Sequence, residues 1–209
     1  MQLTSQSFSD GSAIPGEFAF CIPAAEGHVA LSRNRNPQLA WTGAPAGTQS
    51  FALICHDPDV PSRGDDVNQE SRNVPADLPR VDFFHWVLVN LPADANNIAA
   101  GSHSETVTAK GKPGPVLPDG SRHGINDYTG WFASDGQMKG DYFGYDGPCP
   151  PWNDSIRHHY VFTVFALDVP KVAVEGHFTG QQVREAIAGH IQAQASITGT
   201  YSLNPSVPA

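Results

Sequence analysis

The sequence predicts a mainly β protein in which two antiparallel sheets pack face to face as a sandwich. Three short runs of apolar and aromatic residues, 50–56, 83–91 and 160–167, each end at proline or aspartate, as strands do. Runs that are apolar on both faces suit the central strands of a sandwich. The 18 prolines and 20 glycines favour turns over long helices, because proline lacks an N–H and clashes with the preceding turn.

Two further elements are expected near the C-terminus. Thr179 followed by Gln182 matches a capping box, in which each side chain satisfies a free backbone N–H at a helix start. An apolar stripe at helical spacing then predicts a helix over about 180–193 that packs at the edge of the sandwich. The stripe consists of Val183, Ala186, Ile187, His190 and Ile191. Residues 196–203 alternate, with Ile197, Tyr201 and Leu203 on one side, and predict a last strand.

The whole chain, 1–209, is expected to form one domain with two long loops, about 62–82 and 99–140. Both stretches are polar and rich in turn residues, and neither carries an apolar core of its own. Loops longer than about 12–15 residues are uncommon unless they serve a site or are disordered. We therefore expect these two loops to lie near whatever site the protein has.

Charge and cysteine content narrow the function classes. Twelve Lys and Arg residues against 21 Asp and Glu give a net charge of −9, which repels nucleic acids and anionic membranes. The three cysteines, Cys21, Cys55 and Cys149, are widely spaced and odd in number, so we expect three reduced thiols and neither a disulfide framework nor a zinc site. No signal peptide and no membrane-spanning run is evident. These observations predict a cytoplasmic protein without stable membrane insertion.

Chemically useful residues cluster at the ends and edges of the predicted strands. Asp57 begins D-P-D-V-P, His85 lies within the second apolar run, and G-P-C-P-P leads towards His158 and Tyr160. Each feature alone has an ordinary structural explanation: a turn, a core histidine, a rigid proline loop. Together they suggest a site, because a buried aspartate or histidine is costly unless it pairs with another group or a ligand.

Several motifs in a fixed order resemble the phosphatidylethanolamine-binding proteins, in particular the bacterial branch described as Raf-kinase-inhibitor-like. They are N-P-Q-L-A-W, P-A-G-T-Q-S-F, D-P-D-V-P, H-W-V-L-V-N-L-P, G-Y-D-G-P-C-P-P and H-H-Y-V-F-T-V-F-A-L-D. The resemblance implies a Greek-key β-sandwich with a small surface pocket for phosphate, phosphorylated headgroups, acetate or similar anions. By position it implies a ligand-binding set of Asp57, His85, Pro150, Pro151, His158 and Tyr160.

The remaining residues of this region receive supporting roles. Asp59 and Pro61 are expected to shape the loop that carries Asp57. Among residues 148–151 only Cys149 has a backbone N–H, because the other three are prolines; Cys149 therefore joins the expected ligand-binding set. The loop 62–82 connects D-P-D-V-P to the strand of His85, so we expect it to fold over or beside the pocket.

Strand geometry separates the two adjacent histidines. Side chains alternate between the two faces of a strand, so His158 shares a face with Tyr160 and His159 points the other way. An imidazolium attracts an anion, and affinity is therefore expected to fall as pH rises past a histidine pKa of about 6.5.

Three functions remain open on the sequence alone. The first is a small-molecule anion or phospholipid-headgroup binder, without a cofactor, that modulates a kinase or protease partner and forms a homodimer. The second is an acid–base or metal-dependent hydrolase that uses Asp57, Asp59, His85 and His158. Against it, no H-x-H, H-E-x-x-H, C-x-x-C or G-x-S-x-G spacing occurs. The third is a purely structural or interaction protein with a vestigial pocket.

Overall fold

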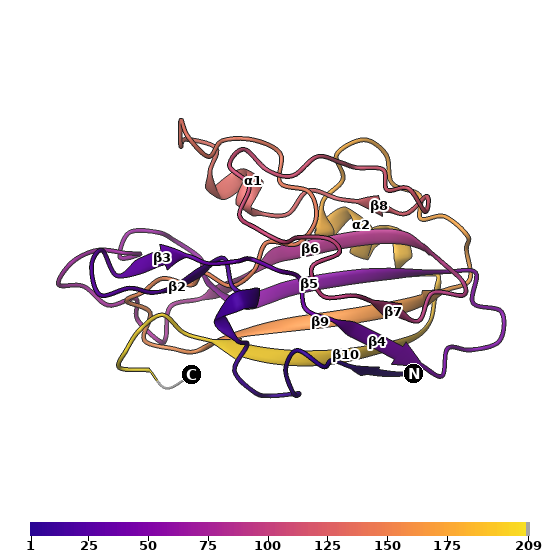
Figure 1. The fold of residues 1–209 in the computed structure, drawn as a ribbon, viewed down its shortest axis with the longest axis horizontal. Coiled ribbons are helices and arrows are strands. Elements are labelled where there is room, and N and C mark those ends of the chain that lie inside the picture. The colour runs from indigo at the N-terminus through magenta and orange to yellow at the C-terminus, as the bar shows by residue number, and fades with distance from the viewer. Residues whose placement is uncertain (208–209) are drawn as a thin grey trace.

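Long antiparallel strands form the centre of the molecule (Figure 1). The computed structural model describes residues 1–207. Its largest sheet has five strands in the order β10-β9-β5-β6-β8. These strands are β5 (Ser50–Pro61), β6 (Arg80–Pro92), β8 (Arg122–His123), β9 (His158–Leu167) and β10 (Ile191–Tyr201). The predicted runs thus lie in β5, β6 and β9, the three central strands.

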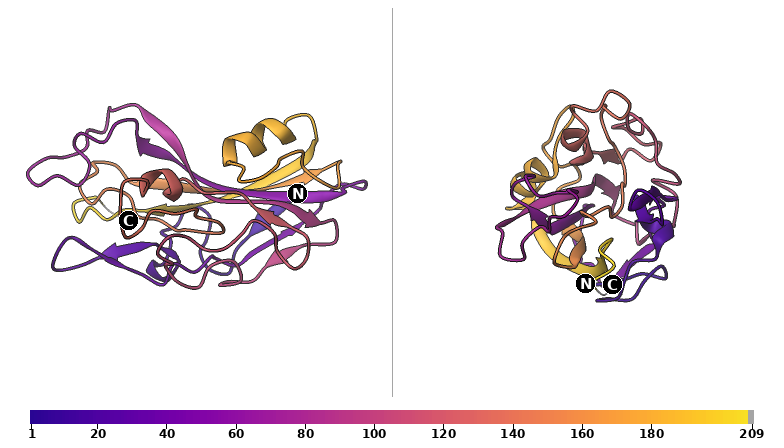
Figure 2. Two further views of the ribbon diagram at one scale, coloured as in Figure 1. Left: turned by 90° about the horizontal axis from the view of Figure 1, so that it is seen from above. Right: turned by 90° about the vertical axis from the view of Figure 1, so that its left-hand side faces the viewer.

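A second layer covers one face of this sheet (Figure 2). It contains a three-stranded sheet, β1 (Gln2–Thr4), β4 (Leu39–Thr42) and β7 (Asn97–Ile98), and the pair β2 (Cys21–Pro23) and β3 (Val29–Leu31), preceded by a 3₁₀ turn, Gly16–Phe18. Leu39 and Trp41 of this layer pack with Phe51 and Phe162 of the large sheet. The mainly β, antiparallel architecture is therefore confirmed.

The other face of the large sheet is covered by α2 (Gly180–Ile187). The predicted capping box is present, with Thr179 and Gln182 each bonding the other's backbone N–H. Val183 and Ile187 pack on Ile54. The prediction of a helix to residue 193 is wrong, because Ile191 already pairs with Leu167 as the start of β10.

The two predicted loops are shorter than expected or contain elements of their own. Because β5 runs to Pro61 and β6 starts at Arg80, the first loop is 62–79. The second contains β8, which pairs with β6, and a one-turn helix, α1 (Tyr128–Trp131). No helix within residues 1–207 is long and apolar enough to cross a membrane.

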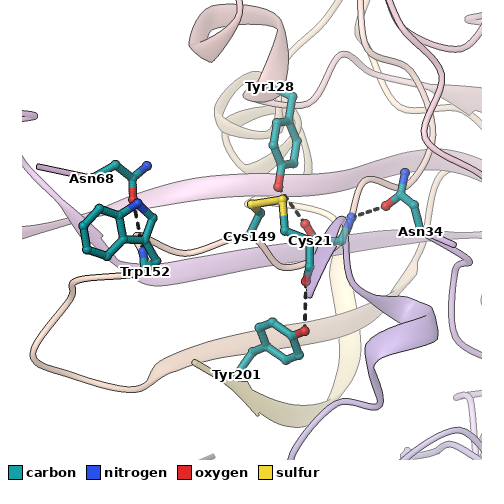
Figure 3. The surroundings of a disulfide bond; sticks show 8 residues. Cys21, Asn34, Asn68, Tyr128, Cys149, Trp152 and Tyr201 are labelled. Carbon is teal, nitrogen blue, oxygen red and sulfur yellow. Dashed lines mark hydrogen bonds between the residues drawn. A yellow bond between two sulfur atoms is a disulfide. The ribbon is translucent and has the colours of Figure 1, made fainter. Parts of the chain in front are cut away.

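The prediction of three reduced thiols is wrong for two of them. Cys21 and Cys149 form a disulfide across 128 residues (Figure 3). Phe20 and Cys21 both donate their backbone N–H to the carbonyl of Pro148, which brings β2 against the G-P-C-P-P loop. Such a separation leaves no spacing signal in the sequence. Cys55 remains a buried free thiol.

Candidate ligand-binding cavity

One cavity of about 520 Å³ lies at the end of the large sheet where β5, β6 and β9 meet the 62–79 loop, α1 and the G-P-C-P-P loop. All seven residues expected to bind a ligand line it: Asp57, His85, Cys149, Pro150, Pro151, His158 and Tyr160. The predicted register of β9 is also found, since His158 is buried on the cavity side and His159 is exposed. The 62–79 loop contributes to the wall, as expected of it.

A β-bulge places His85 on the cavity wall. Cys55 of β5 pairs with Trp86 of β6, but the next residue, His56, pairs with Phe84. His85 is therefore an extra residue on β6, and a bulge of this kind re-aims side chains next to functional sites. As a result, His85 and Trp86 both lie on the inner side of the sheet, while Phe84 and Val87 pack on the helix side.

One ring nitrogen of His85 is occupied by a hydrogen bond to the backbone. Its Nδ1 lies 2.7 Å from the backbone carbonyl of Asp146, and because a carbonyl only accepts, Nδ1 carries the proton. In return, the Asp146 N–H donates to the carbonyl of His85 at 3.0 Å. The other nitrogen, Nε2, has no hydrogen-bond partner among residues 1–207. Burial lowers the pKa of His85, so Nε2 presents a lone pair to the cavity at neutral pH.

The segment that orients His85 is itself fixed by a buried carboxylate. Asp146 is fully buried. Its Oδ1 accepts from Asn34 and from Lys112, each at 2.7 Å, and its Oδ2 accepts from Asn126 at 2.8 Å. Lys112 neutralises the charge of this carboxylate. We conclude that the carbonyl holding His85 belongs to a rigid, fully satisfied cluster.

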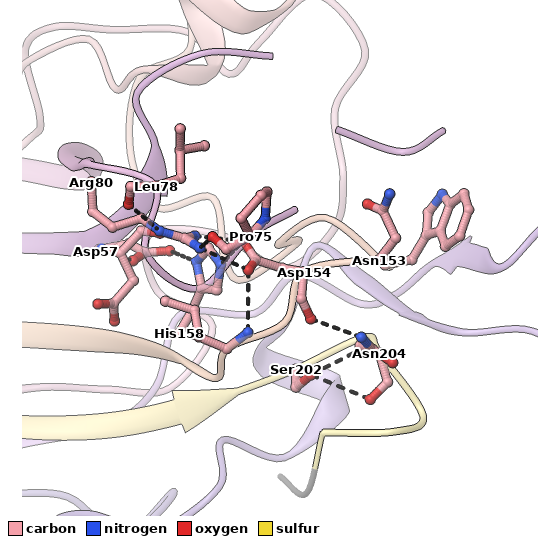
Figure 4. Close-up of polar contacts among 12 residues, drawn as sticks. Asp57, Pro75, Leu78, Arg80, Asn153, Asp154, His158, Ser202 and Asn204 are labelled. Atoms are coloured by element: carbon pink, nitrogen blue, oxygen red, sulfur yellow. Dashed lines mark hydrogen bonds and ion pairs between the residues drawn. The ribbon is translucent and has the colours of Figure 1, made fainter. Parts of the chain in front are cut away.

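His158 is bound at both ring nitrogens (Figure 4). Nδ1 lies 2.6 Å from Asp57 Oδ2, and Nε2 lies 3.0 Å from Asp154 Oδ2. Burial alone would lower the pKa of His158, but hydrogen bonds to Asp154 and Asp57 outweigh it and raise the pKa to about 9. His158 is therefore an imidazolium at neutral pH, and each of its two ring N–H groups donates a hydrogen bond to a protein carboxylate.

Arg80 completes this buried cluster. Its two terminal nitrogens contact the two oxygens of Asp154 at 2.6 and 3.0 Å, a bidentate pair. Burial raises the pKa of Asp154, but hydrogen bonds from His158 and Arg80 prevail and lower it. The two cations, Arg80 and His158, thus match the two carboxylates, Asp57 and Asp154. These four residues together are called the ionic cluster.

Asp59 and His159 lie apart from the cavity. Asp59 Oδ2 accepts from the backbone N–H of His159 and contacts its Nδ1, both at 2.8 Å. The Asp59 N–H donates to Asp57 Oδ1 at 2.8 Å, and Arg80 donates to the Asp59 carbonyl. Asp59 is not among the cavity-lining residues, whereas Pro61 is. Of the four residues named for the hydrolase alternative, Asp57, His85 and His158 line the cavity, and Asp59 does not.

Tyr160 and the G-P-C-P-P loop close the inner end of the cavity. Tyr160 is buried, and burial followed by the charge of Asp57 raises the pKa of its hydroxyl, which stays protonated. The loop is anchored by Tyr128, whose hydroxyl donates to the carbonyl of Gly147 at 2.8 Å, and by the disulfide (Figure 3). Cys149, Pro150 and Pro151 therefore offer a fixed wall.

Sequence reasoning missed two groups of residues at this site. The first is the pair Arg80 and Asp154; a signal was present, since Asp154 lies four residues before His158 and a buried histidine needs a partner. The second is the aromatic wall contributed by α1 and its surroundings, notably Trp131 and Phe132. These residues lie in a stretch without strand or helix periodicity, and only the tertiary structure brings them to the cavity.

Comparison with known proteins agrees with this architecture. A sequence model of the phosphatidylethanolamine-binding protein family matches residues 4–202. YbhB of Escherichia coli K12 is 32% identical over 202 residues, covering 97% of this chain and 100% of YbhB. The crystal structure of E. coli YbcL, described as a new member of the mammalian PEBP family, is 28% identical with a TM-score of 0.68, covering 96% of this chain and 97% of that one.

A homologue from Chlamydia trachomatis, CT736, is similar in structure with a TM-score of 0.62 at 29% identity, covering 96% of each chain. The family match spans nearly the whole chain, and the fold matches throughout. The chain therefore belongs to the phosphatidylethanolamine-binding protein family, and its general role is that of a binding protein.

Proposed function

We propose that the protein binds a small oxyanion, such as a phosphate monoester or a phosphorylated headgroup, at the inner end of the cavity. The observation that carries this proposal is that Nε2 of His85 lies at the cavity wall without a hydrogen-bond partner in the described part of the chain. An oxyanion placed against Nε2 stabilises a proton there, because the charged form of the imidazole is then paired. Binding therefore couples to the uptake of one proton between Nε2 and a ligand oxygen.

The ionic cluster supports anion binding through its charge balance, because His158 has no N–H group left to donate to a ligand. Both N–H groups of His158 are used by Asp57 and Asp154, so His158 cannot donate to an anion without losing one of them. Its charge instead neutralises Asp57, which would otherwise repel an anion from the same wall. Tyr160 keeps its proton, and a hydrogen bond to Asp57 contributes to the raised pKa of its hydroxyl.

Calorimetry with inorganic phosphate at about pH 6 and about pH 8 tests the proposal. Affinity should fall as pH rises, since the complex holds a proton that the free site lacks. A hydrogen bond to a charged group contributes about 1.5–3 kcal/mol, so His85→Gln should bind at least about tenfold more weakly and lose the pH dependence. His159→Gln, the same change at an exposed histidine, is the matched control. Absence of binding by the unaltered protein, or unchanged affinity in His85→Gln, contradicts the proposal.

The state of the cysteines bears on the cellular compartment in which the protein works. The expectation of a cytoplasmic protein rested on reduced thiols and on the lack of an evident signal peptide or membrane-spanning run. A disulfide between Cys21 and Cys149 is instead typical of oxidising environments. We therefore propose that the cavity functions in an oxidising compartment. A kinase or protease partner, as the Raf-kinase-inhibitor-like branch implies, and a homodimer stay predictions; co-purification and sedimentation measurements test them.

A further inference from the structure

We propose that the ligand of this cavity is an organic anion with a ring-sized apolar body, and that Trp131 and Phe132 select for that body. This inference rests on the proposed function, since it takes the anionic end of the ligand to lie at His85. It adds a second subsite, formed by residues of the 128–138 segment, which receives the part of the ligand that carries no charge.

The size of the cavity exceeds what an inorganic anion needs. Its volume of about 520 Å³ falls within the range of roughly 300–1,000 Å³ that pockets for drug-sized ligands occupy. Phosphate or acetate against His85 would leave most of that space to water. Because most of the remaining wall is apolar, water there would have few hydrogen-bond partners, and an apolar group would replace it favourably.

The aromatic rings form a continuous path that starts at His85. The ring of Phe83 lies 4.9 Å and that of Tyr128 5.7 Å from the imidazole. Tyr128 is stacked on Phe20 at 4.6 Å and on Phe132 at 5.6 Å. Successive ring contacts therefore connect His85 to Phe20 and Phe132 on the cavity wall. A histidine adjoined by such rings is complementary to a ligand with one charged end and one ring-bearing end.

Exposed apolar side chains lie on the same wall. Trp131 and Leu31 line the cavity, yet they are 54% and 60% exposed. Large exposed apolar groups rimmed by polar residues mark ligand or partner sites. A ligand of the proposed class would cover Trp131 and Leu31 with its apolar body, while its charged end lies at His85.

Affinities for inorganic phosphate, methyl phosphate and phenyl phosphate test the inference. The three ligands share the phosphate group and differ only in the apolar group attached to it. Burying a phenyl ring against the aromatic wall should make phenyl phosphate on the order of tenfold to a hundredfold tighter than methyl phosphate. Trp131→Ala should reduce this ratio at least about threefold. Trp131 is mostly exposed, so the substitution leaves the folded core intact. Val116→Ala, an exposed apolar residue outside the cavity wall, should keep the ratio of the unaltered protein.

The outcomes separate this inference from the proposed function. Equal affinity for phenyl and methyl phosphate overturns the inference while the anion site stands. A ratio that is unchanged in Trp131→Ala and in Phe132→Leu removes both residues as the selecting wall and overturns it as well. Absence of binding by all three phosphates contradicts the proposed function itself. Preference for phenyl phosphate, reduced by Trp131→Ala and not by Val116→Ala, supports the inference.

Discussion

Two buried histidines lie on the wall of the same cavity, and they are held in opposite ways. His158 has carboxylates at both ring nitrogens and a pKa raised to about 9. His85 has one nitrogen on the carbonyl of Asp146 and the other without a partner among residues 1–207, and its pKa is lowered. The first is a cation that is fully satisfied; the second is a neutral ring with one nitrogen available.

The contrast shows that the partner of the second ring nitrogen decides what a buried histidine can do. His158 contributes to stability and to the charge balance of the cavity, because the ionic cluster uses all of its protons. His85 is available for a ligand because the Asp146 cluster orients it through Nδ1 alone. Substitutions at the ionic cluster and at His159, and the pH dependence of stability, test this difference. The disulfide gives a stability effect with which they can be compared, beginning with the largest expected effect.

Breaking the ionic cluster should cost the most stability. Asp154→Asn removes the carboxylate that Arg80 and His158 share. Removing one partner of a buried ion pair leaves an unmatched charge and destabilises by about 3–5 kcal/mol. Urea denaturation gives this loss in the free energy of unfolding. Asp168→Asn, at the exposed pair Asp168–His190, is the control and should change stability by less than about 1 kcal/mol. A similarly small effect of Asp154→Asn would show that the ionic cluster contributes little to the free energy of unfolding.

The disulfide should contribute the next largest amount. It closes a long segment of chain between Cys21 and Cys149, and native disulfides contribute about 2–4 kcal/mol. Replacing both cysteines by serine should lower the free energy of unfolding by that amount. A thiol assay in denaturant without reductant should detect only Cys55, and all three cysteines after reduction. Detection of three thiols before reduction would contradict the disulfide and the oxidising compartment inferred from it.

Stability should fall at alkaline pH because of His158. Its pKa is about 9 in the folded protein and about 6.5 in the unfolded chain. The native state therefore holds a proton that the unfolded state has lost, and this contribution, complete below about pH 6.5, disappears as pH rises through 9. The expected loss is about 2–3 kcal/mol, seen in denaturation midpoints at about pH 6.5 and about pH 9. His158→Gln should abolish this dependence and His159→Gln should retain it; equal slopes in the two variants would refute the assignment.

The smallest effect is expected at His159. Its contact with Asp59 is solvent-exposed, and exposed pairs contribute about 0–1 kcal/mol. His159→Ala should change the free energy of unfolding by less than about 1 kcal/mol and leave phosphate affinity unaltered in calorimetry. A loss of affinity comparable to that of His85→Gln would mean that the anion lies on the wrong side of β9 for the proposed site.

The sequence predicts the central strands and the cavity wall well, because both depend on local signals. Apolar runs mark β5, β6 and β9, and parity along β9 places His158 on the cavity side and His159 outside. Strand alternation could not reveal that His85 is the extra residue of a bulge, since a bulge depends on the pairing of β5 with β6.

Pairings between residues far apart in the chain could not be predicted from the sequence, because they too depend on the tertiary structure. The disulfide joins residues separated by 128 positions, and Arg80 reaches Asp154 across 74. From the sequence, His158 is a direct contact for the anion; in the structure, its two ring nitrogens are occupied before any ligand arrives. Only the complete set of partners distinguishes His158 from His85.

The most direct test is ¹⁵N NMR of the histidine side chains with and without phosphate near neutral pH. Without ligand, His85 should be neutral with its proton on Nδ1, and His158 should be protonated at both nitrogens. On addition of phosphate, Nε2 of His85 should become protonated while His158 keeps both of its protons. If phosphate leaves His85 neutral and instead changes the protonation of His158, the ionic cluster is the anion site and the roles assigned to the two histidines are wrong.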